Sequence, residues 1–271
     1  MDYEKLAESQ KDDDEIKEWL RRETGLRLEK VKIPGAGIDI YCDMTTDVPR
    51  LFLTTPFRKI AFNTLHGLAH PGVRATVKLV TQRYVWPSIN KDCREWARTC
   101  IPCQRAKITR HVTAPKGVFD LPTKRLEHVH LDIIVMPESE GKRYCLTCVD
   151  RFTRWPEAFP MRDQEAETVA RAYYAGWICR FGVPLRITTD QGRQFESNLF
   201  RQLNELTGTT HFKTTAYHPQ ANGMVERFHR QLKAAIKCKE NDRWTEMLPI
   251  VMLGIRAAWK EDLQATTAEL V

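Results

Sequence analysis

The chain has 271 residues, 42% of them apolar and 28% charged, which is enough for at least one sizeable hydrophobic core. No apolar run approaches the roughly 20 residues of a membrane-spanning helix, and the acidic start lacks the pattern of a secretory signal. Residues 1–30 hold ten acidic and seven basic residues, whereas 31–271 hold 25 acidic and 35 basic ones, giving a net +7. The basic body favours a polyanionic partner. Without a secretory signal, the eight cysteines are expected to be thiols or metal ligands.

The first 50 residues predict a helix followed by short strands. Residues 3–23 are polar and highly charged, with a helical pattern. Residues 26–33 and 37–44 alternate apolar and polar side chains around a Pro-Gly-Ala-Gly turn. We therefore expect residues 1–50 to form an N-terminal extension.

Residues 51–103 contain three helical patterns separated by prolines. Pro71 with Gly72 ends the first pattern and Pro87 ends the second, while Ser88 is the expected N-cap of the third. The sequence predicts a small helical domain here. Its expected helices cover residues 56–70, 73–86 and 88–100.

The next 22 residues, 104–125, hold two prolines, six basic residues and one acid, which predicts a basic linker. From residue 126 three strand patterns are followed by alternating helices and strands, an order typical of an α/β fold around a mixed sheet. Asn222 is the expected N-cap of a later helix, and residues 241–271 are expected to form a trailing helical segment. The expected strands are 126–136, 142–150, 154–161, 185–189 and 210–215, and the expected helices are 164–181 and 196–208.

Two histidines and two cysteines have the spacing of a zinc site. His66 and His70 lie four apart in a helical pattern, and Cys100 and Cys103 form a C-x2-C pair after the third helix. Two imidazoles and two thiolates satisfy the tetrahedral requirement of structural Zn²⁺. The alternative is two surface histidines and two buried thiols. The second C-x2-C pair, Cys145 and Cys148, lies in a strand pattern, whose alternating faces favour buried thiols.

Three carboxylates predict a second metal site. Asp132 interrupts an apolar strand, Asp190 follows a short strand, and Glu226 begins a helix. Each has an ordinary alternative: a hydrogen-bonded strand residue, a turn residue, and an ion pair with Arg230. Together, their oxygens suit Mg²⁺ or Mn²⁺, and two such ions support in-line phosphoryl transfer. Asp150 is a rival carboxylate, for which neighbouring arginines favour an ion-pair role.

These motifs together resemble the retroviral-type integrase family. Longer strings, including "HGLAHPGVRATVKLV", "VDRFTRWPEAFP", "TTDQGRQFES" and "TAYHPQANGMVERFHRQLK", are similar to integrases of gypsy-type long-terminal-repeat retrotransposons. The resemblance implies an α/β, ribonuclease H-like catalytic core over residues 126–240. It also implies that residues 51–103 form a helical zinc-binding domain of the His-His-Cys-Cys type. Such a chain is expected to be part of a Pol polyprotein, and the family's C-terminal DNA-binding region is expected to be absent.

The resemblance implies a metal-dependent polynucleotidyl transferase and endonuclease. Such an enzyme trims the 3′ ends of retrotransposon cDNA and joins them to target DNA, with Asp132, Asp190 and Glu226 holding two Mg²⁺ or Mn²⁺ ions and Zn²⁺ in a structural role. The expected partners are double-stranded DNA and further copies of the chain, and no membrane is expected to take part. The expected location is the nucleus, after a cytoplasmic pre-integration stage. The expected DNA contacts are Tyr217, Pro219, Gln220, Asn222, Arg227, Arg230 and Lys233.

Two other functions remain open from the sequence. A truncated or domesticated integrase copy would bind DNA without catalysing integration. A cellular ribonuclease H or another nuclease of the same fold would cleave nucleic acid without joining it. The zinc motif and the helix-borne Glu226 favour the integrase over the nuclease.

Overall fold

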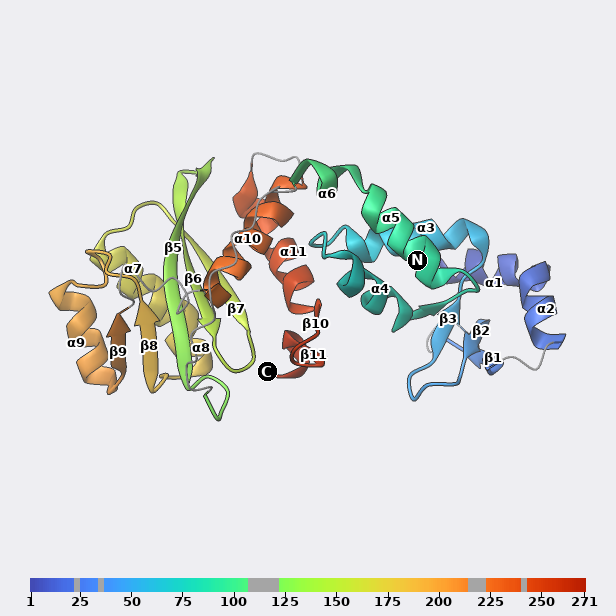
Figure 1. Cartoon of the computed structure of the whole chain (residues 1–271), viewed down its shortest axis with the longest axis horizontal. Helices are drawn as coiled ribbons and strands as arrows, with labels where there is room; N and C mark the ends of the chain where they lie inside the picture. Colours follow the sequence, from blue (N-terminus) through green and yellow to red (C-terminus); the bar gives the residue numbers. More distant parts are fainter. Residues whose placement is uncertain (22–24, 34–36, 107–121, 214–222, 240–242) are drawn as a thin grey trace. The chain divides into compact units, whose positions relative to one another are not determined.

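The computed structural model describes residues 1–21, 25–33, 37–106, 122–213, 223–239 and 243–271. They divide into two compact units, Met1–Gln104 and Arg105–Val271 (Figure 1). No helix within these ranges is both long and apolar enough to cross a membrane.

The first unit combines helices with a four-stranded sheet of order β1-β2-β3-β4. The pairs β1–β2 and β2–β3 are antiparallel, and β3–β4 is parallel. The elements are α1 (Tyr3–Lys11), α2 (Asp14–Arg21), β1 (Leu28–Lys32), β2 (Asp39–Asp43), β3 (Arg50–Phe52), α3 (Thr55–His66), α4 (Val73–Thr81), β4 (Tyr84–Val85), α5 (Ile89–Thr99) and α6 (Ile101–Ala106).

Three details of this unit differ from the sequence expectation. The single helix expected over residues 3–23 is two helices, because the Asp13 side chain accepts from Ile16 N and starts a new one. The helix expected over 73–86 ends at Thr81, and the following residues form β4 beside β3. Ser88 precedes α5, but its hydroxyl donates to the Asp92 carboxylate instead of capping the backbone.

One hydrophobic core joins the expected extension to the expected zinc-binding domain. Leu6 of α1 and Ile40 of β2 belong to the same buried cluster as Phe62 of α3 and Trp86. A further link is the ion pair of Arg58 with Glu15 of α2. Residues 1–50 and 51–103 therefore fold as parts of one unit in the structure.

The second unit contains a five-stranded mixed sheet of order β7-β6-β5-β8-β9 (Figure 1). The pairs β5–β6 and β6–β7 are antiparallel, whereas β5–β8 and β8–β9 are parallel. This arrangement confirms the predicted α/β class. The strands are β5 (His128–Ser139), β6 (Lys142–Asp150), β7 (Pro156–Met161), β8 (Arg186–Thr189) and β9 (Thr210–Lys213), followed by the short pair β10 (Trp259–Lys260) and β11 (Ala265–Thr266).

Helices cover both faces of this sheet. Val129 and Leu131 of β5 point to one face and share a buried cluster with Val169 and Trp177. Residues of β5 that alternate with them, Asp132 among them, point to the opposite face, where α10 and α11 contact the sheet. The helices are α7 (Ala166–Tyr173), the π-helix η1 (Tyr174–Ile178), α8 (Cys179–Phe181), α9 (Asn198–Thr207), α10 (Gly223–Lys237), α11 (Trp244–Arg256) and the 3-10 helix η3 (Thr267–Glu269).

The last described segment is tied into the second unit by a buried carboxylate. Glu157 of β7 is 4% exposed and lies 2.7 Å from Arg256 of α11 and 3.2 Å from Arg180. Trp155 Nε1 donates to the same carboxylate at 3.1 Å, and the Arg256 guanidinium lies over the Trp155 ring. Because its charge is compensated from both sides, Glu157 can remain buried while it joins α11 to the sheet.

Candidate metal centres

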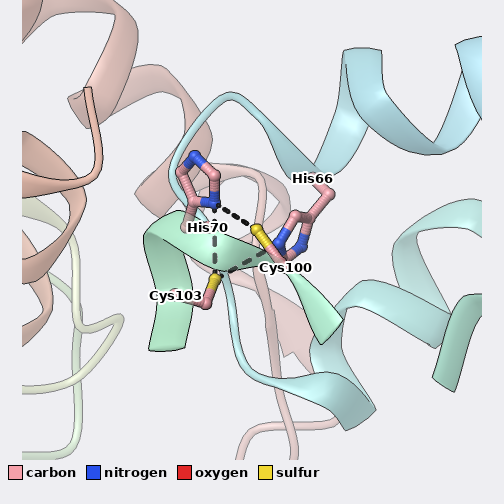
Figure 2. A group of neighbouring side chains, drawn as sticks. All are labelled: His66, His70, Cys100 and Cys103. Carbon is pink, nitrogen blue, oxygen red and sulfur yellow. Dashed lines mark hydrogen bonds between the residues drawn. The ribbon is translucent and has the colours of Figure 1, made fainter. Parts of the chain in front are cut away.

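The structure brings the four predicted zinc ligands together in the first unit. His66 ends α3, His70 lies four residues later, and Cys100 and Cys103 lie at the α5–α6 junction (Figure 2). One ligand atom from each residue lies within 4.8 Å of all the others. The sulfur of Cys103 is 3.3 Å from His66 Nε2 and 3.4 Å from His70 Nδ1, and that of Cys100 is 3.5 Å from His70 Nδ1.

His70 reaches this cluster by a route that differs from the expected helix. The helix α3 stops at His66, and Gly67 is its C-cap. The backbone then bends back, because His70 N donates to His66 O at 2.8 Å and His70 has a left-handed φ of 45°. A left-handed residue shortly after a helix changes the direction of the chain, and here it turns the second imidazole toward the cysteines (Figure 2).

Hydrogen bonding prepares His66 for a metal. Its Nδ1 lies 3.0 Å from the hydroxyl of Thr76, and that hydroxyl donates to Pro71 O. Since the hydroxyl has one proton and gives it to the carbonyl, His66 Nδ1 must be the donor and Nε2 keeps its lone pair. Burial, with His70 and Lys59 nearby, lowers the pKa of His66 to about 4, which keeps the ring neutral.

The spacing of the four ligand atoms fits zinc. Tetrahedral Zn²⁺ with its usual bonds to nitrogen and sulfur places the two kinds of ligand atom about 3.6 Å apart. The three nitrogen–sulfur distances of 3.3–3.5 Å match that value. When bound, Zn²⁺ would neutralise the thiolates and cross-link α3 to the α5–α6 junction.

The second candidate centre lies on the middle strand of the second unit's sheet and at the end of the strand beside it. Asp132 is on β5, and Asp190 directly follows β8. The parallel register pairs His130 with Thr188, so the two aspartates, each two residues further on, emerge at the same level of neighbouring strands. Glu226 lies in the first turn of α10, on the Asp132 face of the sheet.

The charges of Asp190 and Glu226 act on Asp132. The pKa of Asp132 is raised to about 6, first by burial and then by repulsion from Asp190 and Glu226, against the lowering effects of Ile133 N–H and Lys233. Among the residues that the structure describes, His66, His70, Cys100 and Cys103 form the group of three or more potential metal ligands, with ligand atoms within 4.8 Å of one another. Asp132, Asp190 and Glu226, which are also among the described residues, do not form such a group.

In each aspartate, one carboxylate oxygen accepts a hydrogen bond from a main-chain N–H one or two residues later in the sequence. Ile133 N donates to Asp132 Oδ1 at 2.8 Å, and Gly192 N donates to Asp190 Oδ1 at 3.0 Å. These bonds orient the two carboxylates. The rival carboxylate Asp150 is different: it is fully buried and accepts from Leu126 N and from both N–H and O–H of Thr153. Asp150 stabilises the β6–β7 turn.

His229, which the sequence places among positively charged residues, belongs to this centre in another role. Its Nε2 contacts Thr147 Oγ1 at 2.8 Å, and its Nδ1 lies 3.8 Å from Asp132 Oδ2. Burial, then Lys233, lowers the pKa of His229 to about 4. The ring is therefore neutral, and its contact with Asp132 is not an ion pair.

The residues expected to contact DNA are partly described. Arg227, Arg230 and Lys233 lie on the exposed side of α10, whose opposite side buries Val225, Phe228 and Leu232. This alternation is the usual pattern of an amphipathic helix. The other expected contacts, Tyr217, Pro219, Gln220 and Asn222, lie outside the described residues.

The second centre suits a hard divalent cation. Its donors are three carboxylates, and oxygen donors are the ligands that Mg²⁺ and Mn²⁺ prefer. Asp132 supports the fit, because burial raises its pKa first and the negative charges of Asp190 and Glu226 raise it further. A divalent cation would remove this repulsion.

The mixed sheet, with helices on both faces, and the two centres define a class: a zinc-binding unit followed by a ribonuclease H-like α/β core. Residues 54–109 match the model of the integrase zinc binding domain, and residues 122–219 match that of the integrase core domain. The chain belongs to the retroviral-type integrase family.

Known relatives are much longer proteins. The chain is 28% identical over 201 residues to the Gag-Pol polyprotein of walleye dermal sarcoma virus, covering 73% of this chain and 11% of that protein. It is 31% identical over 170 residues to the retrovirus-related Pol polyprotein from transposon 412 of Drosophila melanogaster, covering 62% of this chain and 14% of that protein. A solved structure, the magnesium complex of the HTLV-2 integrase catalytic core domain in its trimeric form, shares 16% identity with a TM-score of 0.47, covering 55% of this chain and 97% of that chain.

Proposed function

We propose that the chain joins DNA strands as an integrase, a metal-dependent polynucleotidyl transferase with endonuclease activity. It trims the 3′ ends of a cDNA copy of a mobile element, of the gypsy type, and transfers these ends to target DNA. The observation that supports the proposal is the parallel register of β5 and β8, in which Asp132 and Asp190 lie at the same level, with Glu226 in the first turn of a helix that contacts β5. Membership of the integrase family supports it.

The chemistry follows from the donor set. Asp132, Asp190 and Glu226 would hold two Mg²⁺ or Mn²⁺ ions, which activate the attacking oxygen and stabilise the leaving oxygen of an in-line displacement. In the trimming step water attacks a phosphodiester near the cDNA end, and the P–O bond that breaks leaves a 3′-hydroxyl on the cDNA and releases the terminal nucleotides. In the joining step this 3′-hydroxyl attacks a phosphodiester of the target DNA, and the target strand's 3′-oxygen leaves. Neighbouring side chains hold the three carboxylates in place, and basic side chains bind phosphate. No side chain of the protein forms a covalent intermediate.

The basic side of α10 is the proposed DNA surface next to this centre. Arg227, Arg230 and Lys233 follow Glu226 on the exposed part of the helix, where they can neutralise phosphates without reading bases. The double-stranded partners are the element's cDNA ends and its target DNA. A nuclear site of action, after assembly in the cytoplasm and with further copies of the chain, follows from this role.

The test is strand processing and strand transfer on oligonucleotides carrying the element's ends, with Mg²⁺ or Mn²⁺. Asp132→Asn, Asp190→Asn and Glu226→Gln should each reduce both reactions at least 100-fold, because each removes a charge that the ions need. Glu167→Gln on α7 is the matched control, since Glu167 is exposed and pairs with Arg171. Equal activity of Glu226→Gln and Glu167→Gln contradicts the proposal.

The second candidate is DNA binding without catalysis. It is favoured by one observation: among the described residues the three carboxylates, unlike the four zinc ligands, do not form a group of close metal ligands. It predicts wild-type DNA affinity for the three carboxylate variants and no strand transfer by the unmodified chain with either ion. Strand transfer that depends on Glu226 rejects it.

A further inference from the structure

The two aspartates of the carboxylate centre share a bonding pattern at their main chain. Thr147 Oγ1 donates to the carbonyl oxygen of Asp132 at 3.0 Å, and Thr189 Oγ1 donates to that of Asp190 at 2.7 Å. Both threonines are fully buried. A lost hydrogen bond at such a position leaves a buried polar group unsatisfied, which is costly.

Each of these threonines also contacts a histidine. His229 Nε2 lies 2.8 Å from Thr147 Oγ1, and His211 Nε2 lies 2.8 Å from Thr189 Oγ1. A hydroxyl has one proton, and both hydroxyls give it to the aspartate carbonyl. The ring nitrogen must therefore donate, so both histidines carry their proton on Nε2.

The two Thr–His pairs connect each aspartate to a neighbouring element. Thr147 of β6 is directly opposite Asp132 in the sheet register, and His229 lies one turn after Glu226 on α10. The first pair thus links the helix of Glu226 to the strand of Asp132. In the second pair His211 of β9 is opposite Ile187 in the register, and its side chain reaches Thr189, the last residue of β8 before Asp190. This second pair fixes the end of β8 to the edge strand.

We propose that His229 and His211 are positioning residues, each of which holds one aspartate of the cation site in place through a threonine. This inference rests on the proposed function, because a positioning role requires that the two aspartates bind a cation. Mg²⁺ demands near-ideal octahedral geometry, so small displacements of an aspartate main chain reduce its affinity. Groups that orient metal ligands typically contribute 10–100-fold to that affinity.

The proposal depends on one atom of each ring. Glutamine can place an N–H donor where Nε2 lies, whereas asparagine, one carbon shorter, replaces the position of Nδ1. His229→Gln and His211→Gln should therefore keep the bond to threonine, and His229→Asn and His211→Asn should lose it. A purely space-filling role would not separate glutamine from asparagine in this way.

The experiment is calorimetric titration of the full, zinc-loaded chain with Mn²⁺, with the thermal unfolding midpoint measured for each variant. Thr147→Val, His229→Leu, Thr189→Val and His211→Leu should each weaken Mn²⁺ binding about tenfold. Combining Thr147→Val with His229→Leu should add little, because both remove the same bond. Combining Thr147→Val with Thr189→Val should weaken binding about 100-fold.

A third Thr–His pair provides the matched control. His128 Nε2 contacts Thr188 Oγ1 at the same 2.8 Å, but within the described part of the chain Thr188 donates to neither aspartate. His128→Leu should bind Mn²⁺ within about twofold of the unmodified chain. A tenfold loss in His128→Leu, or equal affinities of the Gln and Asn variants, overturns the proposal.

This experiment distinguishes a failure of the proposed function from a failure of the proposed positioning role. If Asp132→Asn binds Mn²⁺ as tightly as the unmodified chain, the carboxylate centre is not the cation site and both fall. If Asp132→Asn abolishes binding while His229→Leu and His211→Leu leave it unchanged, the proposed function stands and the positioning role is wrong.

Discussion

At the scale of single residues, burial and neighbouring negative charges act together on Asp132. It is mostly buried, with 20% of its side chain exposed, and faces two further carboxylates. Without a cation its carboxyl group binds a proton more readily than an ordinary aspartate does, since its pKa is raised to about 6. The residue therefore favours metal binding at the expense of stability in the metal-free protein.

This cost predicts a pH dependence of the metal-free protein. A carboxyl group whose folded pKa exceeds its unfolded value stabilises the fold below about pH 4, and this contribution is lost as pH rises through about 6. Asp132→Asn removes the ionisation, so above pH 7 it should be more stable than wild type by on the order of 2 kcal/mol. Urea unfolding in chelator at pH 4.5 and 7.5 measures this difference. Equal stability of the two proteins at pH 7.5 contradicts the assigned burial and repulsion.

Single residues were predictable where spacing alone identifies the chemistry. His66 and Cys103 follow motifs whose ligand types are sufficient evidence for zinc. The roles of His229 and His211 depend on threonines that are distant in sequence and adjacent only after the sheet forms. The sequence shows His229 only as one of several basic residues in the α10 segment, and the burial that keeps its ring neutral is not visible in that pattern.

At the scale of elements, the helix over residues 166–181 is closely packed on the sheet. Its middle is the π-helix η1, which contains Gly176. A Cβ built on Gly176 would lie no more than 2.9 Å from three ring carbons of Phe159 on β7. The glycine therefore permits a helix–sheet distance that any larger residue would increase.

This contact makes Gly176→Ala a test of the packing. Alanine gains about 1 kcal/mol of helix propensity over glycine, but overpacking in a core costs typically 1–3 kcal/mol. We expect a net loss of about 1 kcal/mol in the free energy of unfolding. Phe159→Leu should remove the clash, so the double variant should lose less than the two single losses combined. A more stable Gly176→Ala protein would show that the ring moves freely and that propensity decides.

Elements were predictable where the pattern was long. The strands β5 and β6 have 12 and 9 residues and were anticipated from their apolar runs. The strands β3 and β4 have three and two residues, too few for alternation to appear, and their pairing is non-local. The break between α1 and α2 had a readable signal, since an acidic run supplies an N-cap.

At the scale of the whole molecule, each unit has its own core, but the sources of their stability differ. The first unit adds a proposed Zn²⁺ cross-link to a core that draws on residues 1–50 as well as on the helices. The second unit is built on the five-stranded sheet and the buried Glu157 ion pairs. Metal removal should therefore affect the units unequally.

We predict that a strong chelator destabilises Met1–Gln104 selectively. Amide hydrogen exchange measured by peptide should accelerate at least tenfold in α3 and α5 and should remain unchanged in β5 and β6, with added Zn²⁺ restoring protection. Cys100→Ser should reproduce the effect of chelator, and Cys179→Ser, at an exposed cysteine of α8, should not. Unchanged exchange in α3 under chelation contradicts the zinc assignment.

The central claim is that Asp132, Asp190 and Glu226 share a cation. The most direct measurement is anomalous diffraction from crystals of the full chain soaked in Mn²⁺, with data collected at the manganese and zinc absorption edges. The zinc peak between His66 and Cys103 serves as the internal positive control. We predict at least one manganese peak about 2.1 Å from carboxylate oxygens of Asp132 and Asp190, with Glu226 within reach of the same or a second ion. A clear zinc peak with no manganese density among the three carboxylates would contradict the account.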